Sequence, residues 1–356
     1  MSGADGMIGT DRISGAHDGG PHRPRVALAM GSNELRDSLI NAECFARLTA
    51  VADVVSTEVL TDFESPRARE VLGQTTALIT GWRSPRIDDS VLDLSPGLRL
   101  VAHAGGTVKN HVAPAAWERG LLITTAAQAN AVPVAEYALA FILLAGKDAF
   151  ASQAGQRREQ SRYRKVVLSQ AVGNHGNTVG IIGASRTGRL LIELLKPYQL
   201  HILLADPTLS PAEAAGLGAE LVPLEELMRR SKVVSLHAPV LPSTVGMIGA
   251  AELAPMQEGS TFINTARGVL VDHDALRTQL RTGRISAVLD VTYPEPLPDG
   301  DELYNLPNVI LTPHIAGSLG NELTRMGSLA VSEVERLARG AAPKHSISRE
   351  TLAAMA

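Results

Sequence analysis

The sequence predicts an α/β protein made of two Rossmann-like, doubly wound parallel-sheet domains. Short apolar runs alternate with segments of helical periodicity along most of the chain, as expected for strands joined by helices in a parallel sheet. A glycine-rich turn follows one of these runs and precedes a helical segment. The 356 residues are enough for about two domains of roughly 100–200 residues each.

The first α/β unit is expected to end near residue 127. Three apolar runs have the length and composition of buried strands, at residues 25–30, 77–80 and 98–102. Residues 34–49 and 66–72 between them have the spacing of helices.

The second unit is expected to be larger. Six apolar runs predict strands at residues 178–182, 200–205, 233–236, 261–264, 287–291 and 309–311. Helical spacing occurs at residues 131–145, 186–195, 224–230 and 274–281. This is the size of a doubly wound dinucleotide-binding domain. A last helix, at residues 321–339, could fold back onto the first unit, which would split that domain in the sequence.

No segment is predicted to direct export or to span a membrane. Residues 1–24 are rich in Gly, Asp and His and lack an apolar core, so we expect a disordered tail rather than a signal peptide. The most apolar stretch, residues 131–146, is interrupted by Pro133 and Glu136. We judge it too short and too polar for a bilayer, and interpret it as a buried helix.

Composition excludes several classes of protein. Lys+Arg 33 against Asp+Glu 37 gives a net charge of −4, which argues against a protein that coats nucleic acid or an anionic membrane. The 3% of aromatic residues argue against base-stacking surfaces. The single cysteine, Cys44, excludes an intramolecular disulfide and a Cys-cluster metal site, and no other metal site is expected. A reducing compartment, the cytoplasm, is the natural setting.

A candidate phosphate loop follows the strand predicted at residues 178–182. It contains Gly183, Ser185, Arg186, Thr187 and Gly188, so serine replaces the middle glycine of the G-x-G-x-x-G pattern. The outer glycines allow a tight turn and close helix–strand packing, and the helix N-terminus offers N–H groups to a pyrophosphate. Alone, such a loop can equally be a simple strand–helix turn.

An acidic residue strengthens the cofactor interpretation. Asp206 ends the next predicted strand, 23 residues after Gly183, close to the spacing of the carboxylate that binds the ribose hydroxyls. Pro207 and Thr208 follow, and no neighbouring Arg or Lys is present to accept a 2′-phosphate. We therefore expect NAD rather than NADP; the alternative role of Asp206 is a cap at the strand end.

Three candidate catalytic residues follow the ends of later predicted strands. Arg267, Glu295 and His314 should thus meet at the edge of the sheet where ligands bind. Arg267 could bind the carboxylate of a 2-oxo acid or polarise its carbonyl. His314 could exchange a proton with the carbonyl oxygen as hydride reaches the carbon, while Glu295 holds the imidazole and favours its protonated form. Singly, each could be a surface charge, a loop residue or a rigid turn.

The chain resembles the D-isomer-specific 2-hydroxyacid dehydrogenase family over about residues 25–339. The matching segments are residues 130–136, 179–188, 237–239, 263–268, 290–298 and 312–314. The resemblance implies an NAD-binding domain at residues 130–316 and a substrate domain formed by residues 25–129 and 317–345, with a cleft between the two domains. It places the family's catalytic Arg, Glu and His on Arg267, Glu295 and His314.

The resemblance also implies binding residues and an assembly. Its NAD contacts fall on Arg186, Thr187, Asp206, Ala238, Pro239, Thr244, Thr265, Ala266 and Asp290. Its substrate-carboxylate loop falls on Gly105, Gly106 and Thr107. The family is usually dimeric, and the helix at residues 134–144 would lie in the homodimer interface. The implied partner is a small 2-oxo or 2-hydroxy acid.

Two departures from the family pattern stand out. Ser185 replaces the middle glycine, which could weaken cofactor affinity without removing a catalytic group. After Gly106 the usual acidic residues are missing and Lys109 is present. Lys109 is either a solvated loop charge or a residue that admits a substrate with an additional anionic group.

Three other histidines lie close in sequence to the candidate site. His103 and His111 flank the substrate loop and could touch substrate, whereas His237 is expected to be a hydrogen-bonded structural residue.

An alternative function, an NAD(H)-sensing, corepressor-like binding protein, could have the same fold. Formate dehydrogenase is disfavoured because its relatives have glutamine in place of Glu295, whereas phosphite oxidation uses the same three residue types.

Overall fold

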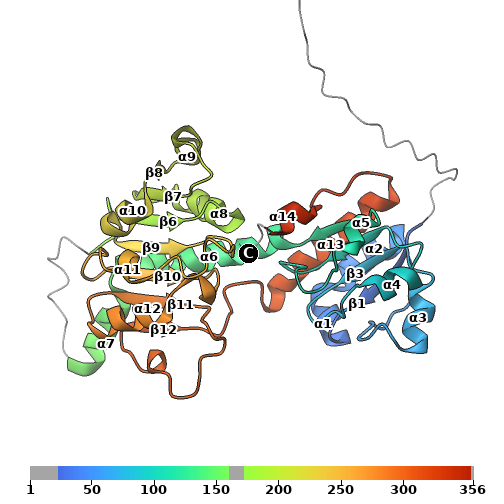
Figure 1. Cartoon of the computed structure of the whole chain (residues 1–356), viewed down its shortest axis with the longest axis horizontal. Coiled ribbons are helices and arrows are strands. Elements are labelled where there is room, and N and C mark those ends of the chain that lie inside the picture. The colour runs from blue at the N-terminus through green and yellow to red at the C-terminus, as the bar shows by residue number, and fades with distance from the viewer. Residues whose placement is uncertain (1–22, 160–171, 354–356) are drawn as a thin grey trace, which may run out of the picture.

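The computed structural model describes residues 23–159 and 172–353. These residues form two lobes that are joined by a long helix and by the segment that returns after the last strand (Figure 1). Most of the predicted tail, residues 1–22, lies outside the described residues. Arg23, which we assigned to that tail, instead contacts the first lobe, where its Nε donates to Asp53 at 2.9 Å.

The first lobe contains a five-stranded parallel sheet of order β2-β1-β3-β4-β5. Its strands are β1 (Arg25–Ala29), β2 (Asp53–Val54), β3 (Ala77–Thr80), β4 (Leu100–His103) and β5 (Leu122–Thr125). The sequence predicted three of them; the two-residue β2 and β5 were missed. The helices of this part of the chain are α1 (Asn33–Leu39), α2 (Ala42–Val51), α3 (Pro66–Leu72), α4 (Asp89–Leu94) and α5 (Ala115–Glu118).

The second lobe contains a seven-stranded parallel sheet of order β12-β11-β10-β9-β6-β7-β8. Its strands are β6 (Thr178–Ile182), β7 (His201–Ala205), β8 (Glu220–Leu221), β9 (Val233–Leu236), β10 (Thr261–Asn264), β11 (Ser286–Leu289) and β12 (Val309–Leu311). All six predicted strands are present, and the short β8 adds a seventh. The strand order reverses between β6 and β9, which is where doubly wound sheets bind ligands.

The remaining helices begin with α6, before the second sheet, and continue to α14, after it. They are α6 (Ala127–Gly146), α7 (Ala149–Glu159), α8 (Arg186–Leu195), α9 (Pro211–Leu217), α10 (Leu224–Arg230), α11 (Ala250–Leu253), α12 (His273–Arg281), α13 (Leu323–Ala338) and α14 (Arg349–Ala353). Three short 3₁₀ helices are η1 (Gly268–Leu270), η2 (Glu302–Tyr304) and η3 (Gly320–Glu322). The expectation of two doubly wound parallel sheets is confirmed.

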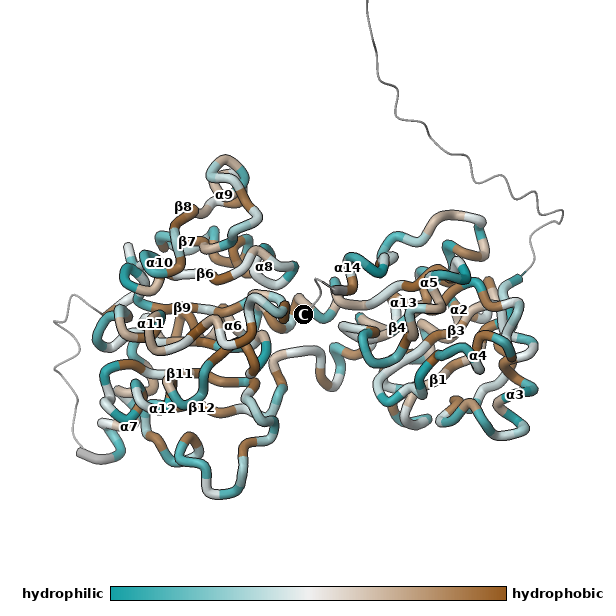
Figure 2. Tube along the Cα trace, viewed as in Figure 1, coloured by the Kyte–Doolittle hydropathy of each residue, from teal (hydrophilic) through white to brown (hydrophobic). Residues whose placement is uncertain are grey.

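Alternating strand residues supply the cores on both faces of each sheet. In the first lobe, Leu28 and Ile79 pack with α1, α2 and α13, whereas Ala29 and Leu78 pack with α3 and α4. Hydrophobic segments accordingly lie along the strands of both sheets, and hydrophilic segments lie on the outer loops and helices (Figure 2). Helix α13 follows the second sheet in sequence but packs on α1, α2 and β4 of the first lobe, as the fold-back prediction required (Figure 1).

Helix α6 bridges the two lobes. Ala129 near its start belongs to a core of the first lobe, and Ala135, Ala138 and Ile142 belong to a core of the second, where α6 packs against α8. Within the described residues, α6 alone is long and apolar enough to cross a membrane, so our argument that this stretch is too short was wrong. Its contacts with both lobes identify it as a core helix of the fold.

One predicted helix is broken. Residues 34–49 form α1 and α2, because α1 ends at its cap Ile40 and Asn41 starts a new helix. The side-chain oxygen of Asn41 accepts the N–H of Cys44 at 2.9 Å and caps α2. The other predicted helices differ from the observed bounds only at their ends.

Candidate functional site

A pocket of about 670 Å³ lies at the carboxyl ends of the strands of the second sheet. The loops after β6, β7, β9 and β10 line it, and Gly106 of the first lobe and Asn130 of α6 complete it. It therefore lies at the point where the strand order reverses and is shared by the two lobes.

The shape of the glycine-rich turn depends on two glycines. At each of them, neighbouring backbone atoms occupy the space that a Cβ would need. Gly183 has φ +93°, and a Cβ there would lie 2.8 Å from the Cα of Ala238. A Cβ on Gly188 would overlap the carbonyl oxygen of Gly183. Only glycine fits these two positions, so the turn can bring backbone N–H groups close to an anion.

Ser185 is compatible with this turn despite its side chain. Its backbone is extended (φ −62°, ψ 177°), a conformation that any residue adopts, and its hydroxyl oxygen accepts the N–H of Gly188 at 3.3 Å as the cap of α8. The serine thus caps the helix whose N-terminus faces the pocket. In this contact the hydroxyl oxygen is an acceptor, so its own proton can be donated to a phosphate oxygen.

Asp206 is fixed at the pocket by three hydrogen bonds. Oδ2 accepts the N–H of Ala184 at 2.7 Å, and Oδ1 accepts the N–H and the hydroxyl of Thr208 at 2.9 and 2.6 Å. Burial raises the pKa of this carboxyl, but the hydrogen bonds from Thr208 and Ala184 and the charge of Arg189 outweigh it and lower the pKa. Asp206 is therefore an anion at neutral pH.

Arg189 is a cation near Asp206 that the sequence reasoning missed. It lies one turn into α8, and its Nε donates to the carbonyl of Ala184 at 2.9 Å, beside the N–H that Asp206 accepts. Our expectation that no Arg or Lys is close to Asp206 considered only neighbours in sequence and is wrong in space.

Arg267 is held at the end of β10 by its own loop. The side-chain amide of Asn264 donates to the carbonyl of Arg267 at 3.0 Å, while its oxygen accepts the N–H of Ala266 at 3.0 Å. Burial lowers the pKa of the Arg267 guanidinium, and the charge of Glu295 opposes that shift. Arg267 lines the pocket and interacts electrostatically with the predicted acid.

His314 and Glu295 form the closest contact among the predicted catalytic residues. Nδ1 of His314 lies 2.6 Å from Oε1 of Glu295, and the two side chains are 47% and 42% exposed. The ring can thus donate its Nδ1 proton to the carboxylate and present Nε2 to solvent or to a ligand. His314 has φ 55°, a left-handed conformation that a non-glycine residue holds only when its surroundings impose it.

Asp290 imposes that conformation. Its carboxylate oxygens accept the hydroxyl of Thr312 at 2.7 Å and the N–H groups of Ile315 and Ala316 at 2.8 and 2.9 Å. Its side chain is buried and is absent from the pocket wall among the described residues. Asp290 thus supports the turn that carries His314; the contact with NAD that the resemblance implies for it stays a prediction.

The predicted substrate loop lies at the end of β4. Gly106 lines the pocket, whereas Gly105 packs on the buried ring of His103, whose Nε2 a Cβ at that position would overlap. Nδ1 of His103 lies 2.8 Å from Oγ1 of Thr80, and its ring centroid is 5.1 Å from that of His111. Burial, followed by the charge of His111, lowers the pKa of His103 to about 3. The ring of His103 therefore supports the predicted substrate loop by packing against Gly105.

Lys109 adds positive charge near this edge. Burial and then the charge of Arg267 lower its pKa, so the two cations are close enough to interact. His237, in contrast, is a structural residue as predicted: its Nε2 lies 2.8 Å from Oγ of Ser235, and burial lowers its pKa to about 4.

Most of the predicted binding residues line the pocket. These are Gly106, Gly183, Ser185, Arg186, Thr187, Asp206, Ala238, Pro239, Thr244, Thr265, Ala266 and Arg267. Gly105, Thr107, Gly188, Asp290, Glu295 and His314 lie outside its lining. Sequence reasoning missed Asn130, Val134, Thr208, Leu241 and Met247, which also line it. Val134, Leu241 and Met247 are apolar and carry no local signal that would have marked them. Asn130 and Thr208 did have one, because Asn130 starts a segment that resembles the family and Thr208 lies two residues after Asp206.

The pocket fits a dinucleotide. The glycine turn offers a cradle that a Cβ would fill, and Asp206 offers an anion for ribose hydroxyls. The hydroxyl oxygen of Thr265 is buried at the pocket and has no hydrogen-bond partner within the described residues. By contrast, in residues 23–159 and 172–353 no group of three or more His, Cys, Asp or Glu is placed to hold a metal ion.

Comparison with known proteins assigns the family. Residues 139–316 match the family model described as D-isomer specific 2-hydroxyacid dehydrogenase, NAD binding domain. The D-3-phosphoglycerate dehydrogenase of Mycobacterium bovis is 36% identical over 253 residues, which are 71% of this chain and 47% of that protein. The glyoxylate reductase of Korarchaeum cryptofilum is 30% identical over 297 residues, 81% of this chain and 89% of that protein.

Solved structures agree with the fold. The TT0316 protein from Thermus thermophilus superposes with a TM-score of 0.68 and 29% identity, covering 91% of this chain and all of that one. The chain therefore belongs to the D-isomer specific 2-hydroxyacid dehydrogenase family, and its second lobe is that family's NAD-binding domain. It spans about half the length of the D-3-phosphoglycerate dehydrogenases that it matches.

Proposed function

We propose that this protein is an NAD-dependent oxidoreductase that interconverts a 2-oxo acid and a D-2-hydroxy acid. The observation that carries the proposal is the 2.6 Å contact between Nδ1 of His314 and Oε1 of Glu295, at the same sheet edge as Arg267 and the dinucleotide pocket. An acid–base pair, a fixed cation and a nicotinamide cofactor are the groups that a carbonyl–alcohol interconversion needs.

Each residue has a distinct task in this proposal. The bound cofactor would supply a hydride in its reduced form, NADH, and would accept one in its oxidised form, NAD⁺. Arg267 binds the substrate carboxylate with its planar guanidinium or polarises the carbonyl. Nε2 of His314 gives a proton to the carbonyl oxygen during reduction and takes the hydroxyl proton during oxidation. Glu295 holds Nδ1–H, which fixes the ring and stabilises its charged form.

The pocket residues are proposed to hold NAD. Gly183, Ser185, Arg186, Thr187 and Gly188 would surround the pyrophosphate, and Asp206 would bind the adenosine ribose. The remaining contacts are assigned to Ala238, Pro239, Thr244, Thr265 and Ala266. Asp290 is assigned the support of the turn that carries His314.

The first lobe is proposed to bind the substrate carboxylate through backbone N–H groups of Gly105, Gly106 and Thr107. We propose domain limits at residues 25–129 and 317–345 for the substrate domain and 130–316 for the NAD-binding domain. One contact supports a hinge at these limits: Oδ1 of Asn130 accepts the N–H of Ser318 at 2.9 Å. The chain passes between the two domains once near Asn130 and once near Ser318, and this hydrogen bond joins the two passages.

Two substrate classes correspond to the relatives of this chain. The names of the relatives, D-3-phosphoglycerate dehydrogenase and glyoxylate reductase, correspond to an acid with a second anionic group and to a small plain oxo acid. We favour the doubly anionic class, because Lys109 lies three residues after Gly106, which lines the pocket, and the charge of Arg267 contributes to lowering the pKa of Lys109. Two cations at one substrate site attract a second anionic group.

We further propose a cytoplasmic homodimer. Residues 134–144 of α6 include Tyr137 and Phe141, which are half-buried, and Leu144, which is 42% exposed. Such an apolar face suits a symmetric interface with a second copy. The single cysteine, Cys44, is buried and free, in agreement with a reducing compartment.

The test is a screen for NADH oxidation. The purified protein is mixed with NADH and with glyoxylate, hydroxypyruvate, pyruvate, phenylpyruvate, branched 2-oxo acids and their phosphorylated or dicarboxylic counterparts, and absorbance is followed. The proposal expects turnover with at least one of them. A flat trace across the panel, together with tight NADH binding, would contradict it and support a dinucleotide sensor.

A further inference from the structure

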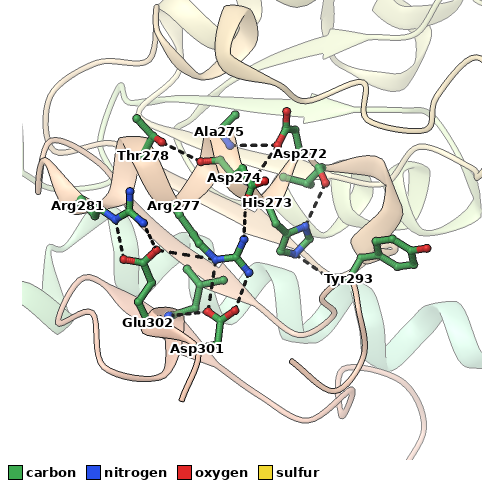
Figure 3. A network of polar contacts seen from close by, with 12 residues as sticks. Asp272, His273, Asp274, Ala275, Arg277, Thr278, Arg281, Tyr293, Asp301 and Glu302 are labelled. Atoms are coloured by element: carbon green, nitrogen blue, oxygen red, sulfur yellow. Dashed lines mark hydrogen bonds and ion pairs between the residues drawn. The ribbon is translucent and has the colours of Figure 1, made fainter. Parts of the chain in front are cut away.

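Residues of helix α12 contact Tyr293 and Asp301 (Figure 3), which lie on either side of Glu295 in the sequence. His273, the first residue of α12, contacts Tyr293, two residues before Glu295. Arg277, one turn later, binds Asp301, six residues after Glu295: its Nη2 lies 2.6 Å from Oδ2, and the Asp301 side chain is only 8% exposed. Glu295 therefore lies between two points at which one helix fixes the loop.

The hydrogen bonds of His273 define its protonation state. Nδ1 lies 3.1 Å from the carbonyl oxygen of Val271, and Nε2 accepts the backbone N–H of Tyr293 at 3.2 Å. A carbonyl needs a donor and an N–H needs an acceptor, so the ring is neutral with its proton on Nδ1. Burial lowers the pKa of His273, the charge of Arg277 adds to that shift, and Val271, Asp301 and Asp272 oppose it.

Gly268 makes a second contact with the Thr292–Tyr293 peptide, whose N–H is bound by His273. A Cβ on Gly268 would overlap the carbonyl carbon and oxygen of Thr292 and lie 2.6 Å from the nitrogen of Tyr293. The Thr292–Tyr293 peptide thus lies against Gly268 and His273, and Gly268 directly follows Arg267 in sequence. The position of the Glu295 segment is set relative to the strand end that carries Arg267.

We propose that His273 is a positioning residue: its neutral Nε2 holds the Tyr293 N–H and so sets the reach of Glu295 toward His314. The inference rests on the proposed function for its kinetic consequences. Glu295 and His314 are both solvent-exposed, so their 2.6 Å contact has little packing to maintain it and depends on where the two loops are anchored. His314 is anchored by Asp290, and Glu295 by His273.

Two substitutions separate positioning from packing. His273→Gln keeps an acceptor that can reach the Tyr293 N–H, whereas His273→Leu fills similar space without an acceptor. We expect His273→Leu to lower kcat about tenfold, to leave the KM for NADH nearly unchanged, and to shift the pH profile of kcat. His273→Gln should restore most of kcat and the wild-type profile. Arg281→Gln is the control: Arg281 is on the same helix as His273, its substitution removes an exposed ion pair with Glu302 of η2, and it should change neither.

The inference is overturned if His273→Leu has wild-type kcat and pH profile, or if His273→Gln is impaired as much as His273→Leu while both are folded by circular dichroism. A readout without turnover separates it from the proposed function. In the wild type, ¹⁵N NMR should show the neutral Nδ1–H form of His273, and hydrogen exchange of the Tyr293 amide should be slow. That exchange should accelerate in His273→Leu, whether or not the wild type reduces any 2-oxo acid; equal exchange rates would contradict the contact itself.

Discussion

Asp290 holds the turn on which His314 stands. The carbonyl oxygen of Asp290 accepts the N–H of His314 at 2.9 Å, and its carboxylate accepts the next two N–H groups, of Ile315 and Ala316, at 2.8 and 2.9 Å. A buried carboxylate with these partners can impose the left-handed backbone at His314. Asp290 therefore has a structural reason to be an acid, independent of any cofactor contact.

Asp290→Asn tests this assignment. An amide must turn one N–H₂ group toward the N–H groups that the carboxylate accepts, so the turn loses at least one charge-assisted hydrogen bond, worth about 1.5–3 kcal/mol. We expect kcat to fall about 10²-fold because His314 is displaced, and the Kd for NADH to stay nearly unchanged. Weaker NADH binding at unchanged kcat would contradict this account and support a cofactor contact.

Asp206 should determine the preference for NADH over NADPH. Its carboxylate is anionic and would repel a 2′-phosphate, and Arg189 lies close enough to attract one once the acid is removed. Asp206→Ala is expected to lower the ratio of kcat/KM for NADH over NADPH by at least about tenfold, or roughly 1.4 kcal/mol. The double variant Asp206→Ala with Arg189→Ala should lose part of the gained NADPH activity. An unchanged ratio in the single variant counts against the ribose role.

The buried histidines predict a loss of stability in mild acid. Burial lowers the pKa of His103 to about 3 and that of His237 to about 4, from an ordinary value of 6.5. Below pH 6.5 these histidines are protonated in the unfolded chain but stay neutral in the folded chain. The free energy of unfolding therefore falls as the pH falls toward 4. Each histidine should account for about 2 kcal/mol between pH 7.5 and 5.

Urea unfolding of the wild type and of His237→Asn at both pH values measures this effect. The pH-dependent loss should be about 2 kcal/mol smaller in His237→Asn, because that variant has one histidine fewer to protonate on unfolding. His201→Asn, at the exposed start of β7, is the matched control. If His237→Asn shows the same loss as the wild type, His237 is not buried in its neutral form.

Lys109 should matter for substrates with two anionic groups. The ratio of kcat/KM for a phosphorylated or dicarboxylic 2-oxo acid over a plain one is compared in the wild type and in Lys109→Ala. We expect the ratio to fall about tenfold in Lys109→Ala, since one of two interacting cations is removed, and to recover in Lys109→Arg. A ratio that does not change would identify Lys109 as a loop charge without a role in specificity.

The sequence predicted the features that are encoded locally. The turn from Gly183 to Gly188 and the positions of Arg267, Glu295 and His314 after strand ends could be predicted because strand, turn and helix signals are each contained in a few residues. The Asn41 cap that separates α1 from α2 carried such a signal as well, and it was overlooked.

The remaining features depend on contacts between distant segments. The proximity of Arg189 to Asp206, the support of His314 by Asp290 and the support of Tyr293 by His273 link loops that lie 17 to 25 residues apart in sequence. No local pattern distinguishes His273 from any other polar residue at the start of a helix. Similarly, β8 pairs through only two residues, too few to produce a periodic signal.

The most direct measurement for the account as a whole is the turnover of His314→Ala with NADH and the best 2-oxo acid of the screen, alongside NADH binding by fluorescence. The account predicts that kcat falls by about 10²–10⁴ while the Kd for NADH is retained, because the variant loses the proton donor and keeps the pocket. Wild-type turnover in His314→Ala would contradict it.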